Sequence, residues 1–391
     1  MKRFKKLVGV AMASAMVFSM AGCGGSNGSG SGNADATTFK IGGTGPLTGG
    51  AAAYGQAVQN AAQLAVDEIN ANGGVNGYML ELNYQDDEHN AEKAVNAYNT
   101  LKDWGVQIVL GSVTSAPCIA VVDKTKEDNI FQLTPSGTAV ECTKHDNAFR
   151  VCFSDPAQGT VSAQYIGENN LATKVAVIYD SSDTYSSGIY ENFAKEAEKY
   201  SFEIVCAEAF TEDSNTDFSV QLQKAKDSGA DMVFLPIYYK EAALILTQAN
   251  GMGFAPTFFG VDGMDGILSG VDNFDASLAE DVMFLTPFAA TSTETNIVNF
   301  VTAYEEKFGE TPNQFAADAY DGVYIIKDLI EKSGVKPSDD TAAICNGLKE
   351  AITNGYSFDG LTGTGITWSA DGEPNKAPSV VIIKGGVYNQ L

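Results

Sequence analysis

The sequence has few of the residues that commonly carry catalysis or hold metal ions. It contains only two histidines, His89 and His145, and neither has a convincing serine or cysteine partner to activate. Its six cysteines show no spacing typical of a zinc site. A glycine-rich stretch at residues 42–50 lacks the third glycine of a dinucleotide-binding loop, because Thr48 stands in its place. We therefore predict no enzyme activity, no metal ion and no cofactor.

Positive charge is scarce as well. The chain has 24 lysines and arginines against 49 aspartates and glutamates, a formal net charge of −25. Such an acidic surface repels the phosphate backbone of nucleic acids, so we exclude that partner. The 391 residues, 44% of them hydrophobic, are enough to build two domains with a core each.

The apolar run near the N-terminus is too short for a stable membrane span. Residues 7–20 follow a basic start, MKRFKK, and residues 1–22 together have the pattern of a secretory signal. The sequence Met20-Ala21-Gly22-Cys23 resembles a bacterial lipobox, which implies that Cys23 carries a lipid. Residues 23–37 have the composition of a flexible tether. We expect a protein anchored by lipid to the extracellular face of the bacterial cell membrane.

Five cysteines remain after Cys23, so at least one has no partner within the chain. They are Cys118, Cys142, Cys152, Cys206 and Cys345. Whether any of them form disulfides stays open.

Strands and helices are predicted to alternate along the chain. The first series has strands at 39–41, 79–84, 106–110 and 130–133, and the second at 175–179, 204–205, 232–235 and 257–259. Helical patterns follow at 297–308, 314–332 and 342–352, then short strands near 365–368 and 379–383. About 350 residues exceed what one core usually supports, so we predict two doubly wound α/β lobes. The first comprises 38–154 and 288–362, the second 155–287 and 363–391, with three hinge crossings near 153–155, 286–288 and 361–364.

Hydroxyl-rich loops follow two successive strands of the first series. The loops are 111–115 (GSVTS) and 134–138 (TPSGT). In an open parallel sheet such loops lie at the carboxyl ends of the strands, where ligands bind. Hydroxyl groups and helix-start N–H groups suit a carboxylate or phosphate, so Ser115, Ser136 and Thr138 are predicted to hold the anionic end of a small ligand. The alternative is that they only cap helices and form turns.

A series of short motifs, in order along the chain, resembles one known family. The motifs include GPLTG at 45–49, DEINANGGVNG at 67–77, YQDD at 84–87, TPSGT at 134–138 and FGVDG at 259–263. They are similar to the branched-chain amino-acid-binding proteins of ABC importers, and the similarity runs from about residue 39 to the end. The resemblance implies the type I periplasmic-binding-protein fold, with the ligand held between two lobes.

The resemblance also implies roles for particular residues. Ser115, Ser136 and Thr138 match the contacts to the ligand carboxylate, by hydroxyl or by backbone N–H, and Tyr185 and Asp262 match the partners of its ammonium group. Three aromatic residues are implied near the cleft: Tyr54, Tyr238 and Phe315. The best-known members have a cysteine pair that would fall at His89 and Thr114, so that disulfide is absent here. The ammonium-binding acid is often glutamate, one methylene longer than Asp262.

The chemistry of an amino acid supports these assignments. A zwitterion needs neutral donors at one end and a carboxylate at the other, and only a closed cleft satisfies both. Taken alone, Asp262 could be a turn residue before Gly263, and the tyrosines could be packing residues. We expect a monomeric protein that delivers a small, aliphatic, branched-chain type of amino acid to the membrane permease of an ABC importer. The alternatives are a sensory protein of the same fold and a transport protein that binds an amide or urea.

Overall fold

The structure, a computed structural model, describes residues 37–391. The predicted signal segment, Cys23 and nearly all of the predicted tether lie outside the described residues. Within residues 37–391, none of the helices combines the length and the apolar composition that crossing a membrane requires.

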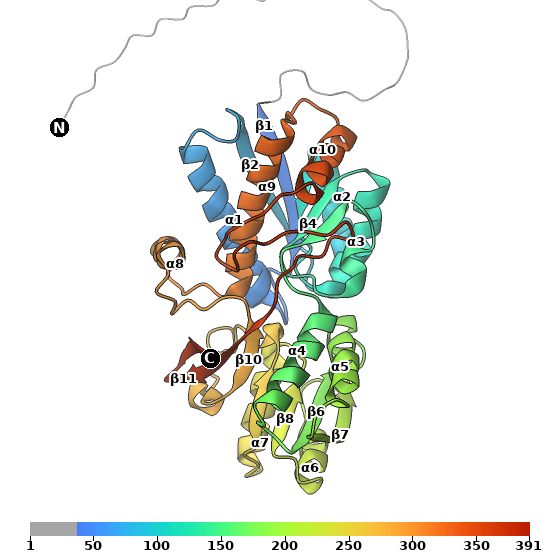
Figure 1. Ribbon diagram of the computed structural model, residues 1–391, viewed down its shortest axis with the longest axis vertical. Coiled ribbons are helices and arrows are strands. Elements are labelled where there is room, and N and C mark those ends of the chain that lie inside the picture. Colours follow the sequence, from blue (N-terminus) through green and yellow to red (C-terminus); the bar gives the residue numbers. More distant parts are fainter. Residues whose placement is uncertain (1–36) are drawn as a thin grey trace, which may run out of the picture. The chain divides into compact units, whose positions relative to one another are not determined.

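The first sheet consists of five parallel strands in the order β2-β1-β3-β4-β5. Figure 1 labels three of them, β1, β2 and β4. Its strands are β1 (Thr38–Gly45), β2 (Met79–Asp86), β3 (Ile108–Leu110), β4 (Phe131–Thr134) and β5 (Ala148–Arg150). Every residue of β3, β4 and β5 is buried, as strands covered on both faces require. The chain leaves β1 to one side for β2 and returns to the other side for β3. This reversal of strand order marks the crevice where such sheets bind ligands.

Six helices accompany the first sheet: α1 (Ala52–Ala71), α2 (Ala91–Trp104), α3 (Ser115–Glu127), α8 (Thr295–Phe308), α9 (Gln314–Ser333) and α10 (Thr341–Thr353). Their ends follow local rules. Asn90 accepts hydrogen bonds from the backbone N–H groups of Glu92 and Lys93 at the start of α2, and Gly105 ends that helix in the left-handed conformation. The helix α9 packs along α1, although more than 240 residues separate them in the sequence.

The second sheet has seven strands in the order β12-β11-β10-β9-β8-β6-β7. The parallel strands are β6 (Lys174–Asp180), β7 (Glu203–Phe210), β8 (Met232–Leu235), β9 (Thr257–Gly260) and β10 (Met283–Thr286). Two antiparallel strands, β11 (Ser379–Lys384) and β12 (Val387–Gln390), extend one edge. Its helices are α4 (Asp155–Glu168), α5 (Thr184–Ala197), α6 (Ser219–Asp227) and α7 (Tyr239–Gly251). The predicted class of two α/β lobes is thus confirmed.

The segment before β11 differs from the prediction. We expected a strand at 365–368 and a crossing near 361–364, but this region forms only isolated bridges, Phe358 with Ile366 and Trp368 with Pro374. Ile366 and Trp368 are buried in the core of the first lobe, and the Trp368 indole N–H donates to the carbonyl of Arg150 at 2.7 Å. The chain therefore stays with the first lobe beyond residue 363 and reaches the second sheet only at β11, as Figure 1 shows.

Candidate functional site

Two loops at the carboxyl ends of β3 and β4 bring hydroxyl groups to one cavity. Ser115 begins α3, and its Oγ lies 3.5 Å from Oγ1 of Thr138 in the next loop. The first N–H groups of a helix have no partner within the helix, so the start of α3 favours a negative charge. The hydroxyl of Ser136 instead donates to the carbonyl of Val113 at 2.7 Å. The hydroxyl proton of Ser136 is thus engaged within the protein, while Ser115 and Thr138 face each other.

The second lobe contributes a buried carboxylate from the loop after β9. Asp262 Oδ1 accepts hydrogen bonds from the Tyr185 hydroxyl at 2.6 Å and from the backbone N–H of Gly263 at 2.8 Å. Burial raises the pKa of Asp262 from 3.8 to about 6, although hydrogen bonds from the Tyr185 hydroxyl and the Gly263 N–H oppose the shift. Among residues 37–391, no lysine, arginine or histidine forms an ion pair with Asp262. The carboxylate therefore has hydrogen-bond donors but no counter-charge.

Two polar side chains beside Asp262 were not among the predicted site residues. Gln158 accepts a hydrogen bond from the backbone N–H of Asp262 at 3.0 Å, and Asp155, at the start of α4, donates its own N–H to the carbonyl of Thr138 at 2.9 Å. The Asp155 carboxyl is buried and its Oδ1 has no partner within the described residues. Burial raises its pKa well above the ordinary value. In the sequence, Asp155 before Pro156 indicates only a helix start, so nothing there revealed this placement.

Aromatic rings form the apolar walls. Tyr54 of α1 lies 4.2 Å from Phe315 between ring centroids, and Tyr185 stacks on Tyr238 at 4.7 Å. The Tyr54 hydroxyl donates to the carbonyl of Gly263 at 2.5 Å and so links the first lobe to the second. These rings bring both lobes into contact at the site.

The structure brings all eight predicted binding residues to one small cavity. They are Tyr54, Ser115, Ser136, Thr138, Tyr185, Tyr238, Asp262 and Phe315, together with Val113, Thr114 and Gly263. Neutral donors, one carboxylate and aromatic walls therefore surround the same space.

A hydrogen bond joins the two positions where the resemblance implied a missing disulfide. His89 Nδ1 and Thr114 Oγ1 lie 2.9 Å apart, and the imidazole meets the ring of Tyr238 edge-on at 5.3 Å between centroids. The cysteines after Cys23 all carry free thiols. Within residues 37–391, no three His, Cys, Asp or Glu side chains gather closely enough to hold a metal ion.

Sequence and structure comparisons relate this chain to known proteins. The periplasmic binding protein family matches residues 38–386. The Leu/Ile/Val-binding protein BraC3 of Rhizobium johnstonii is 32% identical over 309 residues, which cover 78% of this chain and 82% of that protein. A leucine-, isoleucine-, valine-, threonine- and alanine-binding protein of Pseudomonas aeruginosa is 29% identical, over 83% of this chain and 86% of its own length.

Solved structures share the fold. The branched-chain amino acid transporter substrate-binding protein LivJ of Streptococcus pneumoniae, in complex with isoleucine, is 32% identical with a TM-score of 0.82, covering 90% of this chain and 98% of that one. The leucine-binding protein LivK of Thermotoga maritima gives 28% identity and a TM-score of 0.79, with 90% and 97% covered. The comparisons confirm the family resemblance found in the sequence. They also confirm the prediction of a binding protein rather than an enzyme. The chain belongs to the periplasmic binding protein family.

Proposed function

We propose that this protein captures a small aliphatic α-amino acid between its lobes and delivers it to the permease of an ABC importer. The observation that carries the proposal is the unneutralised Asp262 carboxylate, which lines the same small cavity as the hydroxyl groups of Ser115 and Thr138. An amino acid presents one charge of each sign, and this cavity offers each charge its complement.

The ammonium end is assigned to Asp262. A carboxylate buried without a cation is costly, and the raised pKa of Asp262 reflects that cost. A ligand ammonium group would supply the missing positive charge, and the Tyr185 hydroxyl already holds the carboxylate in one orientation. A neutral ligand such as urea would leave the charge unbalanced.

The carboxylate end is assigned to the two loops of the first lobe. Ser115 and Thr138 supply hydroxyl donors, and the start of α3 supplies backbone N–H groups and a favourable dipole. Ser136 would contribute through its backbone, because its hydroxyl proton is used by Val113.

The remaining cavity surface fits an apolar side chain. Val113, Tyr54, Tyr238 and Phe315 line it. Relatives whose names specify leucine, isoleucine and valine support the same side-chain class.

We further propose that Cys23 carries the lipid that keeps the protein at the cell surface, and that it works as a monomer. The lobes would close by movement at the crossings near 153–155 and 286–288, and at the third crossing just before β11. The contact between Tyr54 and Gly263 is of the kind that closure requires.

Calorimetric titration tests the assignment of the ligand class. We expect leucine, isoleucine and valine to bind, whereas the corresponding deaminated acids, decarboxylated amines, short amides and urea bind at least about a hundredfold more weakly, since an unpaired buried charge costs about 3–5 kcal/mol. Deaminated acids that bind as well as the amino acids would overturn the role of Asp262. A preference for amides or urea would replace the proposed ligand class.

A further inference from the structure

Arg150 is the only arginine in the chain besides Arg3, and its side chain is fully buried at the end of β5. Burying a guanidinium group costs several kcal/mol unless it is paired and hydrogen-bonded. Arginine differs from lysine in presenting several donors in a fixed plane. The single use of arginine in the folded part therefore points to a place that needs this geometry.

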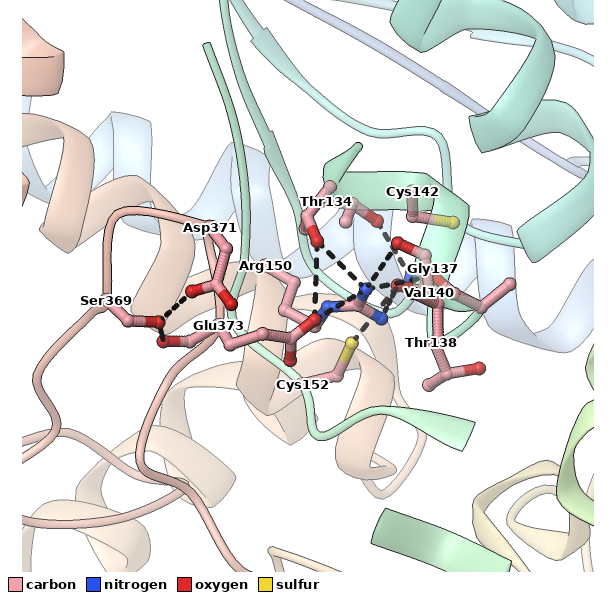
Figure 2. A network of polar contacts seen from close by, with 12 residues as sticks. Thr134, Gly137, Thr138, Val140, Cys142, Arg150, Cys152, Ser369, Asp371 and Glu373 are labelled. Carbon is pink, nitrogen blue, oxygen red and sulfur yellow. Dashed lines mark hydrogen bonds and ion pairs between the residues drawn. The ribbon is translucent and has the colours of Figure 1, made fainter. Parts of the chain in front are cut away.

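The guanidinium group holds the backbone on both sides of Thr138 (Figure 2). Its Nη1 donates to the carbonyl of Gly137 at 2.9 Å, and its Nη2 donates to the carbonyl of Ala139 at 2.9 Å. Nη2 also donates to the hydroxyl of Thr143 at 3.2 Å. The loop that carries the proposed carboxylate donors is therefore fixed from behind by one side chain.

The planarity of the peptide bond between Gly137 and Thr138 fixes the direction of the Thr138 N–H. In a trans peptide the N–H of one residue points opposite to the carbonyl of the residue before it. Because Arg150 draws the Gly137 carbonyl toward itself, the Thr138 N–H must point away from the guanidinium. Within residues 37–391 that N–H has no hydrogen-bond acceptor, and Thr138 lines the cavity.

The C-terminal segment supplies the counter-charge. Glu373 forms an ion pair with Nη2 of Arg150 at 2.9 Å, and the backbone N–H of Arg150 donates to the carbonyl of Gly372 at 3.1 Å. Gly372 must approach closely, since a Cβ there would lie 2.3 Å from the carbonyl oxygen of Ala148. Arg150 is thus held on one side by residues 372–373 and itself holds residues 137–139 on the other.

We propose that Arg150 is a positioning residue of the ligand site, which orients the Thr138 amide and hydroxyl toward the ligand carboxylate without touching the ligand. This inference rests on the proposed function. It differs from a merely structural role in its consequence, because loss of the guanidinium geometry should weaken recognition of the carboxylate and spare recognition of the ammonium group.

The test compares leucine with leucinamide, which keeps the ammonium group and lacks the carboxylate, by calorimetric titration of Arg150→Lys. Lysine keeps the charge but cannot hold two carbonyls in one plane. We expect the Kd for leucine to rise about tenfold or more, the scale of one hydrogen bond to a charged group. The Kd for leucinamide should rise no more than about threefold. The preference for leucine, defined as the Kd for leucinamide divided by the Kd for leucine, should therefore fall.

Lys376→Met provides the matched control. Lys376 is also a buried cation of this region, paired with Asp318 at 2.7 Å and bonded to the Thr362 hydroxyl at 2.7 Å and to the Val151 carbonyl at 3.2 Å. Within the described residues, none of its hydrogen bonds or ion pairs involves residues 137–140. The loss of Lys376 should lower the melting temperature. The Kd for leucinamide divided by the Kd for leucine should stay at the wild-type value.

The outcomes are distinguishable. An unchanged leucine Kd in Arg150→Lys, or equal weakening of both ligands, would overturn the positioning role while leaving the proposed function intact. Wild-type protein that fails to bind leucine would instead contradict the proposed function. If Arg150→Lys shows no cooperative unfolding, the same titrations on Glu373→Gln decide the question, because there the guanidinium loses its ion-pair partner. We expect the preference for leucine over leucinamide to fall less in Glu373→Gln than in Arg150→Lys. An unchanged preference in Glu373→Gln would count against the proposal.

Discussion

Ligand affinity should fall as the solution is acidified through pH 6, because Asp262 must be ionised to hold an ammonium group. With the lobes in contact, as in this structure, the pKa of Asp262 is about 6. About nine in ten of these carboxyls are then ionised at pH 7 and about one in ten at pH 5. The Kd for an aliphatic amino acid should therefore rise about tenfold between pH 7 and pH 5, or about 1.4 kcal/mol.

The same linkage acts on the free protein with the opposite sign. Because the folded-state pKa of Asp262 is raised above 3.8, its contribution to stability is fully present below that pH and is lost as the pH rises through about 6. The total contribution is about 3 kcal/mol. Bound ammonium compensates the ionised carboxylate, so the gap in melting temperature between free and liganded protein should widen from pH 5 to pH 7.

Calorimetric titration at pH 5, 6, 7 and 8 provides the measurement, with Asp262→Asn as the control. The variant should bind about a hundredfold more weakly at pH 7 and show little dependence on pH, because asparagine does not titrate. Burial also raises the pKa of the nearby Asp155 carboxyl well above its ordinary value. A wild-type Kd that changes less than about twofold between pH 7 and pH 5 would refute the reasoning.

Three further predictions concern the donors, the hinge and the anchor. Ser115→Ala and Thr138→Ala should each weaken amino-acid binding about tenfold or more, by about 1.5–3 kcal/mol. Ser136→Ala should bind nearly as wild type, because the Ser136 hydroxyl donates to the carbonyl of Val113. Wild-type calorimetric affinity in all three variants would contradict the carboxylate assignment. Small-angle scattering should show a smaller radius of gyration with saturating ligand than without, and identical profiles would argue against hinge closure. Cys23→Ser should release the protein from membranes with unchanged affinity, and a variant still in the membrane fraction would disprove lipid anchoring.

The fold was predictable where apolar runs are long and regular. The run that forms β6 is almost continuously apolar, as in a strand buried on both faces, and α9 has the period of an amphipathic helix. Both lie close to where they were expected. The prediction was wrong around residues 365–368, where Ile366 and Trp368 alternate as in a strand. Their side chains pack in the core of the first lobe. The indole N–H of Trp368 donates to the carbonyl of Arg150, which is more than 200 residues away in the sequence. Contacts of that range leave no local pattern.

The residues around the cavity were predictable for a different reason. They follow strand ends, where parallel sheets bind ligands, and they stand within motifs shared with a known family. Asp155, Gln158 and Arg150 were missed because each acts through buried contacts with a distant residue. In the sequence they resemble an ordinary helix start, an interior helix residue and a strand end.

The single buried arginine also makes the folded chain a poor substrate for proteases that cut only after arginine. Beyond Arg3 such an enzyme has one target, the bond between Arg150 and Val151, and both residues are buried. Cleavage there requires β5 to separate from the sheet, so under native conditions its rate reports how often that strand opens. The rate of cleavage at this single site therefore measures local unfolding of β5, behind the ligand loop. Slower cleavage in the presence of ligand would show that ligand binding stabilises this strand against opening.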